Sequence, residues 1–258
     1  MKSYRPNSRV IVLSLVLVGV LVTSGFVVIL SAPRPLAGVR VSVYHDNGIT
    51  AASQIALTNM FLWMGAQVTT INGTDIENGA LDACDILVMP GGCWCDQRCQ
   101  ILDEKMELVR EFVENGGAYF GIDGGASYAT GYRLALFQGV LNADANGSGD
   151  YLLEVNVNTA STSPDLSAEP NSYTLFYEAS GYFDSENMTG IISIATYTDT
   201  GYPCMIAFQY EEGRVFLSSP HPEYEEGSTR DGTDFWDTIP DPDSEWNFML
   251  TICQWLLE

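Results

Sequence analysis

The sequence is poor in basic and imidazole side chains. Its 258 residues include 11 Lys and Arg against 33 Asp and Glu, a formal net charge of −22, and only two histidines. Proteins bind the phosphate backbone of nucleic acids through clustered Lys and Arg, so this shortage excludes nucleic acid as an expected partner. A strongly acidic surface instead suits solubility in salty or extracytoplasmic fluid. The chain also lacks internal repeats, and its 46% apolar residues are enough for one medium α/β domain or two small ones.

A long uncharged run follows the first basic residues. Residues 10–33, between Arg9 and Arg34, carry no charge and are dominated by Val, Leu and Ile. At about 1.5 Å per residue a helix of this length crosses a hydrocarbon core of about 30 Å. The alternative is a cleaved signal peptide, although such signals have only about 7 to 15 apolar residues and the cleavage pattern near Ser31 is weak. The run therefore predicts an uncleaved transmembrane anchor.

The charge distribution around this run sets the expected topology. Lys2, Arg5 and Arg9 precede it, and the first acidic residue of the chain is Asp46. Basic flanks stay in the cytoplasm, so we expect the acidic part to lie outside. The predicted organisation is a cytoplasmic N-terminus (1–9), a single-pass membrane segment (10–33), a stem (34–38) and an extracytoplasmic α/β domain (39–258). If the segment is cleaved, the domain is secreted.

Six cysteines follow the uncharged run, at positions 84, 93, 95, 99, 204 and 253. In an oxidising compartment this even number could form up to three disulfides, whose pairing the sequence does not give. The cluster Cys93-Trp94-Cys95 with Cys99 could instead hold a metal. It lacks a second CxxC or a paired His nearby, so local disulfides that brace the loop are the preferred interpretation. No metal and no other cofactor is expected.

Strands and helices alternate in the first half of the chain, which predicts a parallel sheet. The expected strands are 39–44, 66–71, 84–89 and 118–122, and the expected helices are 50–64 and 101–115. Beyond about residue 144 the pattern changes to strands joined by turns, at 151–157, 173–178, 190–196, 204–210 and 214–217. These predict an antiparallel extension of the same domain. A final amphipathic helix is expected over 244–258.

The most informative stretch is Gly121-Ile122-Asp123-Gly124-Gly125-Ala126. A strand that turns sharply into a helix between small residues presents one side chain at the carboxyl edge of a parallel sheet, where open α/β folds have their sites. Asp123 lies at that turn. Small neighbours are needed because the backbone is strained there and a substrate must approach closely.

Three blocks in the same order resemble a known fold. They are residues 88–92 (VMPGG), the turn at residues 121–126 and residues 219–223 (SPHPE). Together they resemble the class I glutamine amidotransferase-like superfamily, and in particular the family named for the N-terminal domain of biotin-protein ligase, over about residues 39–255. The resemblance implies a flavodoxin-like parallel sheet with helices on both faces.

The resemblance also implies roles for particular residues. In that superfamily a cysteine nucleophile occupies the turn, a histidine is its general base, a glutamate orients the histidine, and backbone amides form an oxyanion hole. By position these roles fall on Asp123, His221, Glu223, Gly92 and Gly124. The sequence departs from the family pattern at the nucleophile, because position 123 is Asp.

This departure changes the expected chemistry. A carboxylate is a poor nucleophile toward an amide, and its charge opposes the oxyanion that should develop, so ordinary glutamine hydrolysis is not expected. Asp123 could act as an aspartyl nucleophile on an ester or halide, with His221 activating water. It could pair with His221 or help to hold a cation or an amine without catalysis, or it could simply cap the next helix. A thiol from Cys93 or Cys95 is a further candidate nucleophile.

We expect a pocket in which Tyr44, Gly91, Gly92 and Gly124 bind a substrate or ligand beside the catalytic candidates. The first hypothesis is a domain without glutaminase activity that binds a small molecule or a protein partner. The alternative is an atypical hydrolase using Asp123 with His221 and Glu223. A third is an interaction module that docks through the antiparallel extension and the acidic segment 223–245, which is predicted to be a solvated loop. Trp236 within this segment could cover the pocket.

Overall fold

The computed structural model describes residues 22–23, 26–27, 34–92, 105–131, 133–143, 145–186, 188–225, 228–239 and 243–258. The chain divides into two units, Met1–Pro33 and Arg34–Glu258. In the first, strand β1 (Val22–Thr23) pairs antiparallel with β2 (Phe26–Val27), and the rest of the expected anchor lies outside the described residues. Within the described ranges, no helix is long and apolar enough to cross a membrane.

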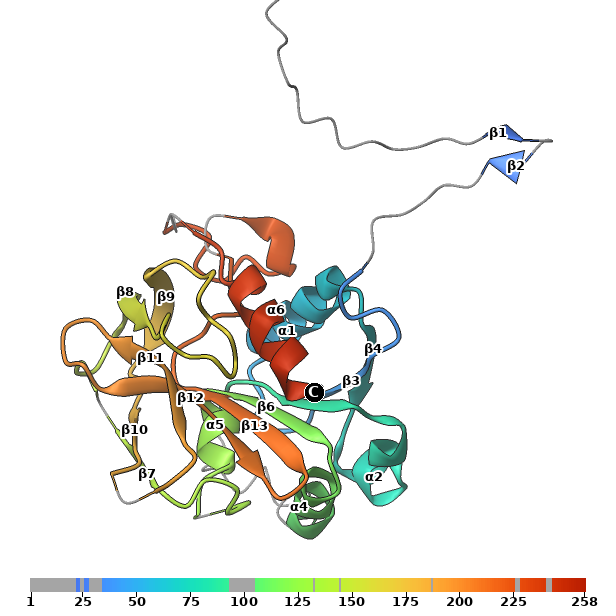
Figure 1. Ribbon diagram of the computed structural model, residues 1–258, viewed down its shortest axis with the longest axis horizontal. Helices are drawn as coiled ribbons and strands as arrows, with labels where there is room; N and C mark the ends of the chain where they lie inside the picture. The colour runs from blue at the N-terminus through green and yellow to red at the C-terminus, as the bar shows by residue number, and fades with distance from the viewer. Residues whose placement is uncertain are drawn as a thin grey trace, which may run out of the picture. The chain divides into compact units, whose positions relative to one another are not determined.

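The second unit is built on one nine-stranded sheet, in the order β4-β3-β5-β6-β13-β12-β11-β8-β9 (Figure 1). Its first five strands run parallel. They are β4 (Gln67–Ile71), β3 (Arg40–Tyr44), β5 (Ile86–Met89), β6 (Ala118–Ile122) and β13 (Gly213–Ser218). Along the chain this is the order 2-1-3-4-5 of flavodoxin-like sheets, whose sites lie outside the carboxyl ends of the strands.

The other four strands of the sheet are antiparallel and come from the segment between β6 and β13. They are β12 (Pro203–Tyr210), β11 (Ile192–Tyr197), β8 (Asp150–Val157) and β9 (Ser172–Glu178). A separate ladder joins β7 (Val140–Asn142) to β10 (Tyr182–Asp184), two strands that the sequence did not predict. The fold is therefore α/β with a mixed sheet, and the expected antiparallel extension is confirmed.

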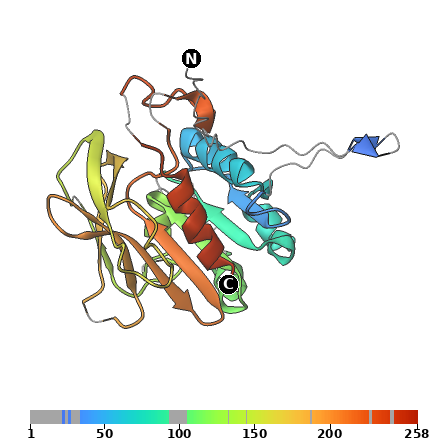
Figure 2. The same cartoon turned by 45° about the horizontal axis from the view of Figure 1, so that its top comes forward.

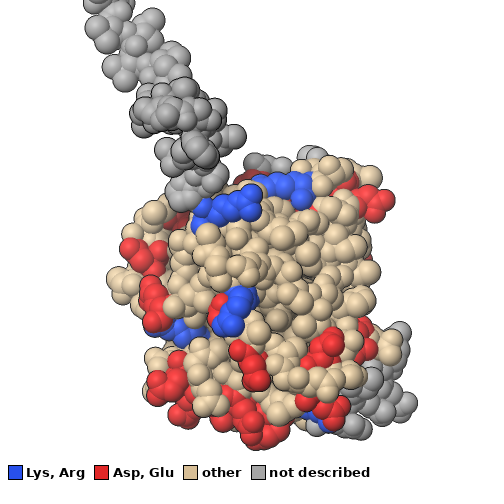
Figure 3. All heavy atoms as spheres, turned by 90° about the vertical axis from the view of Figure 1, so that its right-hand side faces the viewer, with Lys and Arg blue, Asp and Glu red and all other residues tan. Residues whose placement is uncertain are grey.

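Helices cover both faces of the parallel part (Figure 2). α1 (Ala51–Met64) and α6 (Trp246–Leu256) pack on one face, while α2 (Gly73–Glu77), α4 (Met106–Glu114) and α5 (Gly124–Tyr128) pack on the other. Two short 3₁₀ helices, η1 (Ala80–Ala83) and η3 (Thr229–Asp231), complete the described elements. Strand residues alternate between the two cores: Phe120 faces α1 and α6, whereas Tyr119 faces the opposite helices. Acidic side chains outnumber basic ones on the face shown in Figure 3.

Three disulfides do not form, and the local disulfides predicted for the loop of Cys93, Cys95 and Cys99 lie outside the described residues. Cys84, Cys204 and Cys253 are free and buried. They pack in the core as small apolar side chains, and burial raises the pKa of each thiol. The remaining cysteines, Cys93, Cys95 and Cys99, lie outside the described residues.

Candidate functional site

Asp123 lies in a strained turn between β6 and α5. Its φ of 47° and ψ of −111° are in a region that residues other than glycine seldom adopt. The turn is fixed by its backbone, since the Asp123 amide donates to the Ser218 carbonyl at 2.8 Å. It also requires a small neighbour, because a Cβ on Gly125 would lie 2.0 Å from the carbonyl oxygen of Met89. The predicted turn and its glycine requirement are thus present.

The Asp123 carboxylate faces the loop that follows β5. The Gly92 amide donates to Asp123 Oδ2 at 3.0 Å, and the Gly124 amide also favours the charged form of the carboxylate. Burial acts more strongly in the other direction and raises the pKa of Asp123. The side chain makes no capping hydrogen bond with α5, so the helix-cap interpretation of this residue is wrong. One oxygen of Asp123 therefore lies at the amide that the resemblance assigned to an oxyanion hole.

A buried chain of hydrogen bonds fixes the imidazole of His221, which follows β13. His221 Nδ1 lies 2.9 Å from Glu223 Oε1, which also accepts from Ser53 Oγ at 2.6 Å. Ser53 in turn accepts from the Gly91 amide at 2.9 Å. Because Glu223 Oε1 is an acceptor, Nδ1 carries the proton toward it and Nε2 is turned to the other side. Glu223 thus orients His221, as the resemblance implies.

His221 Nε2 is buried and has no hydrogen-bond partner among the described residues. A carboxylate oxygen of Glu178, at the end of β9, lies 3.8 Å away, and the Glu178 side chain is 51% exposed. Burial lowers the pKa of His221, but the carboxylates of Glu223, Asp123 and Glu178 outweigh it and raise that pKa to about 9. With this pKa the ring is a cation at neutral pH, and its Nε2–H faces the Glu178 carboxylate without making a hydrogen bond.

Asp123 and His221 meet at Gly91 without pairing directly. The two side chains form no ion pair within 4.0 Å. A Cβ on Gly91 would lie 2.8 Å from His221 Cε1, 3.2 Å from Asp123 Oδ2 and 3.3 Å from Ser53 Oγ. Asp123 after β6, His221 after β13 and Ser53 in α1 thus converge on position 91, where a side chain would clash with the imidazole.

Aromatic rings form the wall behind His221. Phe176 lies 5.6 Å and Tyr224 5.2 Å from the imidazole, measured between ring centroids. The Trp236 ring packs on Phe176 with 4.8 Å between centroids. Because Phe176 in turn contacts His221, Trp236 lies one ring away from the imidazole. Its predicted role as a cover for the pocket stays a prediction.

Sequence reasoning missed Ser53 and Glu178. Ser53 belongs to a helix whose sequence gives no chemical signal, and it reaches Glu223 only because α1 packs over the carboxyl edge. Glu178 comes from the antiparallel extension, whose docking the sequence did not reveal. Tyr44 is 1% exposed in the core on the α2 and α4 face, and its hydroxyl donates to Asp46 at 3.3 Å. A ligand-binding role for Tyr44 stays a prediction, as does a thiol nucleophile from Cys93 or Cys95.

The acidic segment 223–245 is not a solvated loop throughout its described part. Asp231 is fully buried and accepts from the Glu225 amide at 3.2 Å and the Thr233 amide at 2.9 Å. Arg230 pairs with Glu225 at 3.2 Å, and its guanidinium also lies over two tryptophan rings. Some of the carboxylates therefore organise the segment against α1 and α6 instead of facing water.

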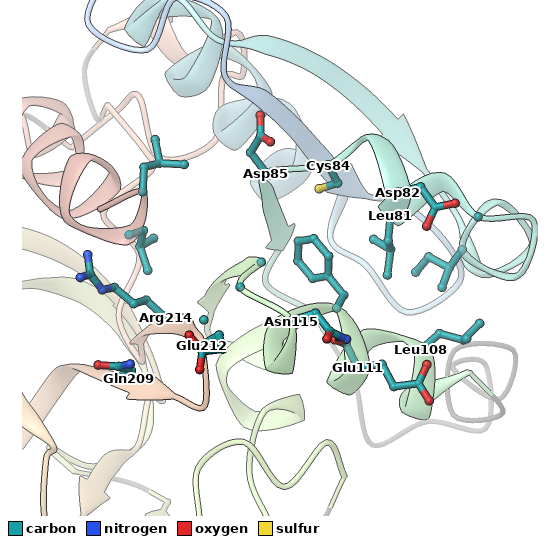
Figure 4. Close-up of a pocket in the computed structure, with 18 of the residues that line it drawn as sticks. Leu81, Asp82, Cys84, Asp85, Leu108, Glu111, Asn115, Gln209, Glu212 and Arg214 are labelled. Carbon is teal, nitrogen blue, oxygen red and sulfur yellow. Dashed lines mark hydrogen bonds between the residues drawn. The ribbon is translucent and has the colours of Figure 1, made fainter.

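A large cavity lies at the other edge of the sheet. It has a volume of about 900 Å³ and is lined by residues at the amino ends of β5, β6 and β13. Figure 4 labels ten of them: Leu81, Asp82, Cys84, Asp85, Leu108, Glu111, Asn115, Gln209, Glu212 and Arg214. None of the site residues described above lines this cavity, so its size does not bear on the chemistry of Asp123.

Comparison with known proteins confirms the resemblance. Residues 39–136 match the family model described as the N-terminal domain of biotin-protein ligase, a range that includes Gly92 and Asp123. A glutamine amidotransferase from Thermotoga maritima has a TM-score of 0.58 at 14% identity, over 85% of this chain and 96% of that one. One from Methylobacillus flagellatus has a TM-score of 0.52 at 11% identity, over 86% and 92%.

Another relative is an uncharacterized protein of Chlamydia muridarum. It is 24% identical over 211 residues, which cover 72% of this chain and 80% of the relative. The family match and the solved structures give the second unit a glutamine amidotransferase-like fold, and the fold alone does not determine its chemistry.

Proposed function

We propose that this amidotransferase-like domain does not hydrolyse glutamine and that it binds a small ligand beside Asp123 and His221. The observation that carries the proposal is the 3.0 Å hydrogen bond from the Gly92 amide to Asp123 Oδ2. In amide hydrolysis a backbone amide at such a place stabilises the oxyanion of the substrate. Here it is already bound to a carboxylate, and the residue at the turn offers no thiol.

The charges of the site disfavour an anionic ligand. Asp123, Glu178 and Glu223 surround a single imidazolium, so two negative charges remain when all are ionised. The α-carboxylate of glutamine would be repelled, whereas a neutral or cationic small molecule would not. A ligand that accepts a hydrogen bond would also satisfy the buried Nε2 of His221.

Ammonia release and ligand-induced stabilisation test the proposal. The full chain should release no more ammonia from glutamine than its Asp123→Ala variant. Small neutral or cationic compounds that raise the Tm of the chain should lose this effect in Glu178→Gln and keep it in Asp199→Ala, an exposed carboxylate in the turn after β11. Glutamine turnover that disappears in Asp123→Ala would contradict the proposal.

A second candidate is an atypical hydrolase in which Asp123 is the nucleophile. The hydrogen-bond chain from Gly91 through Ser53 and Glu223 to His221 supports it, because this chain leaves Nε2 free to exchange a proton. In that case Asp123→Ala and His221→Ala should each abolish turnover while the far-UV spectrum stays unchanged. Equal activity in both variants and the parent would exclude this candidate.

We also propose that the domain is held outside the cytoplasm by residues 10–33, with secretion as the alternative. The support is the uncharged run and the basic residues that precede it. Each aspartate at the centre of a membrane helix costs about 3 kcal/mol, so the double variant Leu17→Asp, Val18→Asp should leave the membrane fraction. A chain that stays in the membrane after both changes, or a domain that external protease cannot reach, would contradict this topology.

A further inference from the structure

The orientation of the Asp123 carboxylate discriminates between electrophiles. Attack of the carboxylate on an acyl carbon would produce a mixed anhydride, and the oxyanion of that substrate would need the amide of Gly92, which Asp123 Oδ2 already occupies. Attack on a saturated carbon creates no oxyanion and produces an ordinary ester. When water later attacks this ester, the oxyanion forms on an Asp123 oxygen, beside the Gly92 amide. The geometry therefore suits displacement at a saturated carbon.

The charges around the site select the leaving group. A halide would depart as an anion beside Glu178 and Glu223, which repel it. An oxygen leaving group can take a proton from a neighbouring acid and depart without charge. His221 is placed to be that acid, since its Nε2–H is buried without a hydrogen bond and its ring borders the same position at Gly91 as Asp123 Oδ2.

We propose that Asp123 opens small epoxides by forming a covalent ester, with His221 as the acid and then the base. This inference rests on the hydrolase proposed above as the second candidate. The epoxide is the oxygen electrophile that fits best, because it is compact and Gly91, Gly92 and Gly124 place no side chain beside Asp123 and His221. Its ring strain also offsets the weak nucleophilicity of a carboxylate.

The atoms and protons of the reaction balance in two steps. First, an oxygen of Asp123 bonds to the epoxide carbon, the ring carbon–oxygen bond breaks, and the ring oxygen takes the proton of His221 Nε2. Second, neutral His221 removes a proton from water, whose oxygen attacks Cγ of the ester. The tetrahedral intermediate expels the diol oxygen, which takes the proton back from His221. The proton left on Asp123 passes to His221, and the sum is epoxide plus water to diol.

The titratable groups that face His221 allow it to act as an acid in the first step and as a base in the second. Burial disfavours the protonated ring, while Glu223 from the segment after β13, Asp123 from the turn after β6 and Glu178 from β9 all favour it. The ring is therefore an acid at rest. Esterification removes the charge of Asp123, and with it one of the groups that hold the proton on His221, so the ring becomes a better base for the second step.

An isotope experiment on the full chain tests the proposal, with styrene oxide as the probe. In one turnover in ¹⁸O water, the label should enter the Asp123 peptide and the diol should keep unlabelled oxygen. Acid quenching within the first turnover should also give a styrene oxide adduct on Asp123 that hydroxylamine removes, as it does an ester but not a thioether from cysteine. His221→Gln should lower turnover by roughly 10²- to 10⁴-fold, and Asp199→Ala should not change it.

A second probe separates the possible failures. 4-Nitrobenzyl bromide needs no acid, so over a long incubation it should esterify Asp123 in both the parent and His221→Gln, although Glu178 and Glu223 slow the departure of bromide. Esterification by the bromide but not by styrene oxide would overturn the epoxide inference and leave the aspartyl hydrolase standing. No Asp123 ester with either probe, or ¹⁸O found first in the diol, would overturn both. Binding of a small ligand without turnover would then remain as the function of the site.

Discussion

The two edges of the parallel sheet carry their charges in different ways. At the carboxyl edge, His221 and Glu223 are 2% and 0% exposed and linked to Asp123 around one glycine. At the amino edge, Arg40 pairs with Asp85 and Arg214 with Glu258, with side chains 23% to 64% exposed around a cavity of about 900 Å³. The ion pairs around the larger opening are thus partly screened by solvent, and Arg40 lowers the pKa of Asp85 there. At the closed carboxyl edge the charged groups are desolvated, and burial opposes the charged forms of Asp123 and His221. Desolvation, more than cavity size, marks where chemistry is expected.

Removing one carboxylate at each edge of the sheet should give the largest difference in the free energy of unfolding. Glu223→Ala leaves His221 Nδ1 and Ser53 Oγ without their shared acceptor in a buried site, which should lower the free energy of unfolding by about 3 kcal/mol. The loss should not be larger, because His221 can release its proton. Glu258→Ala removes an exposed partner of Arg214 and should cost at most about 1 kcal/mol. Urea unfolding of the two variants measures both values. Equal losses would mean that the carboxyl edge is not desolvated as described.

The pH dependence of stability should come from the carboxyl edge. The pKa of His221 rises from 6.5 in the unfolded chain to about 9 in the folded one, so the folded state holds the proton more tightly. This contribution is complete below pH 6.5, falls as pH rises toward 9 and is absent well above it, a change on the order of 3 kcal/mol. Urea unfolding at pH 6 and 9 should show this decline in the parent and lose it in His221→Gln. An unchanged slope in the variant would assign the decline to other groups.

Ser53→Ala tests the hydrogen bonds that support His221 at the carboxyl edge. Ser53→Ala leaves the Gly91 amide without its acceptor and Glu223 without one donor, which should cost roughly 1–3 kcal/mol. Ser167→Ala is the matched control, because Ser167 is exposed and its loss should stay within about 0.5 kcal/mol. Loss of a donor to Glu223 also makes that carboxylate a stronger partner for His221, so the imidazole pKa followed by NMR should rise. A fall in that pKa would show that Ser53 does not act through Glu223.

The parallel half could be predicted from the sequence because its signals are local. Apolar runs entering glycine pairs set β5 and β6, and the turn at Asp123 follows from small residues on both sides of one polar side chain. Strand β13 begins one residue before the predicted strand 214–217, since Gly213 already pairs with Tyr210. The short ladder of β7 and β10 was missed because strands of three residues leave no periodic pattern.

The candidate site also has residues that local sequence motifs predicted and residues that only tertiary packing brings together. Asp123, His221 and Glu223 were found because each lies in a short motif, at residues 121–126 or 219–223, and the ordered motifs resemble a known family. Ser53 and Glu178 were not, because each reaches His221 or its partner only through tertiary packing, over 170 residues of chain in the case of Ser53 and Glu223. The sequence also could not predict that Cys84, Cys204 and Cys253 are free. An even number of cysteines does not show which of them lie buried without another cysteine nearby.

Gly91→Ala tests whether His221, Asp123 and Ser53 converge on one point, and its main expected effect is on binding or turnover. Gly91→Ala would press a methyl group against His221 Cε1 at 2.8 Å and toward Asp123 Oδ2, so ligand binding or turnover should fall by at least about tenfold while the fold persists. Gly131→Ala is the matched control: an added Cβ there meets nothing nearer than 3.8 Å, so stability should change by less than about 1 kcal/mol and the site should be unaffected. Unfolding and binding measured on both variants separate crowding of the site from a general intolerance of alanine. If Gly91→Ala binds and turns over like the parent, the three side chains do not act at one point, and the contrast between the two edges would then rest on burial alone.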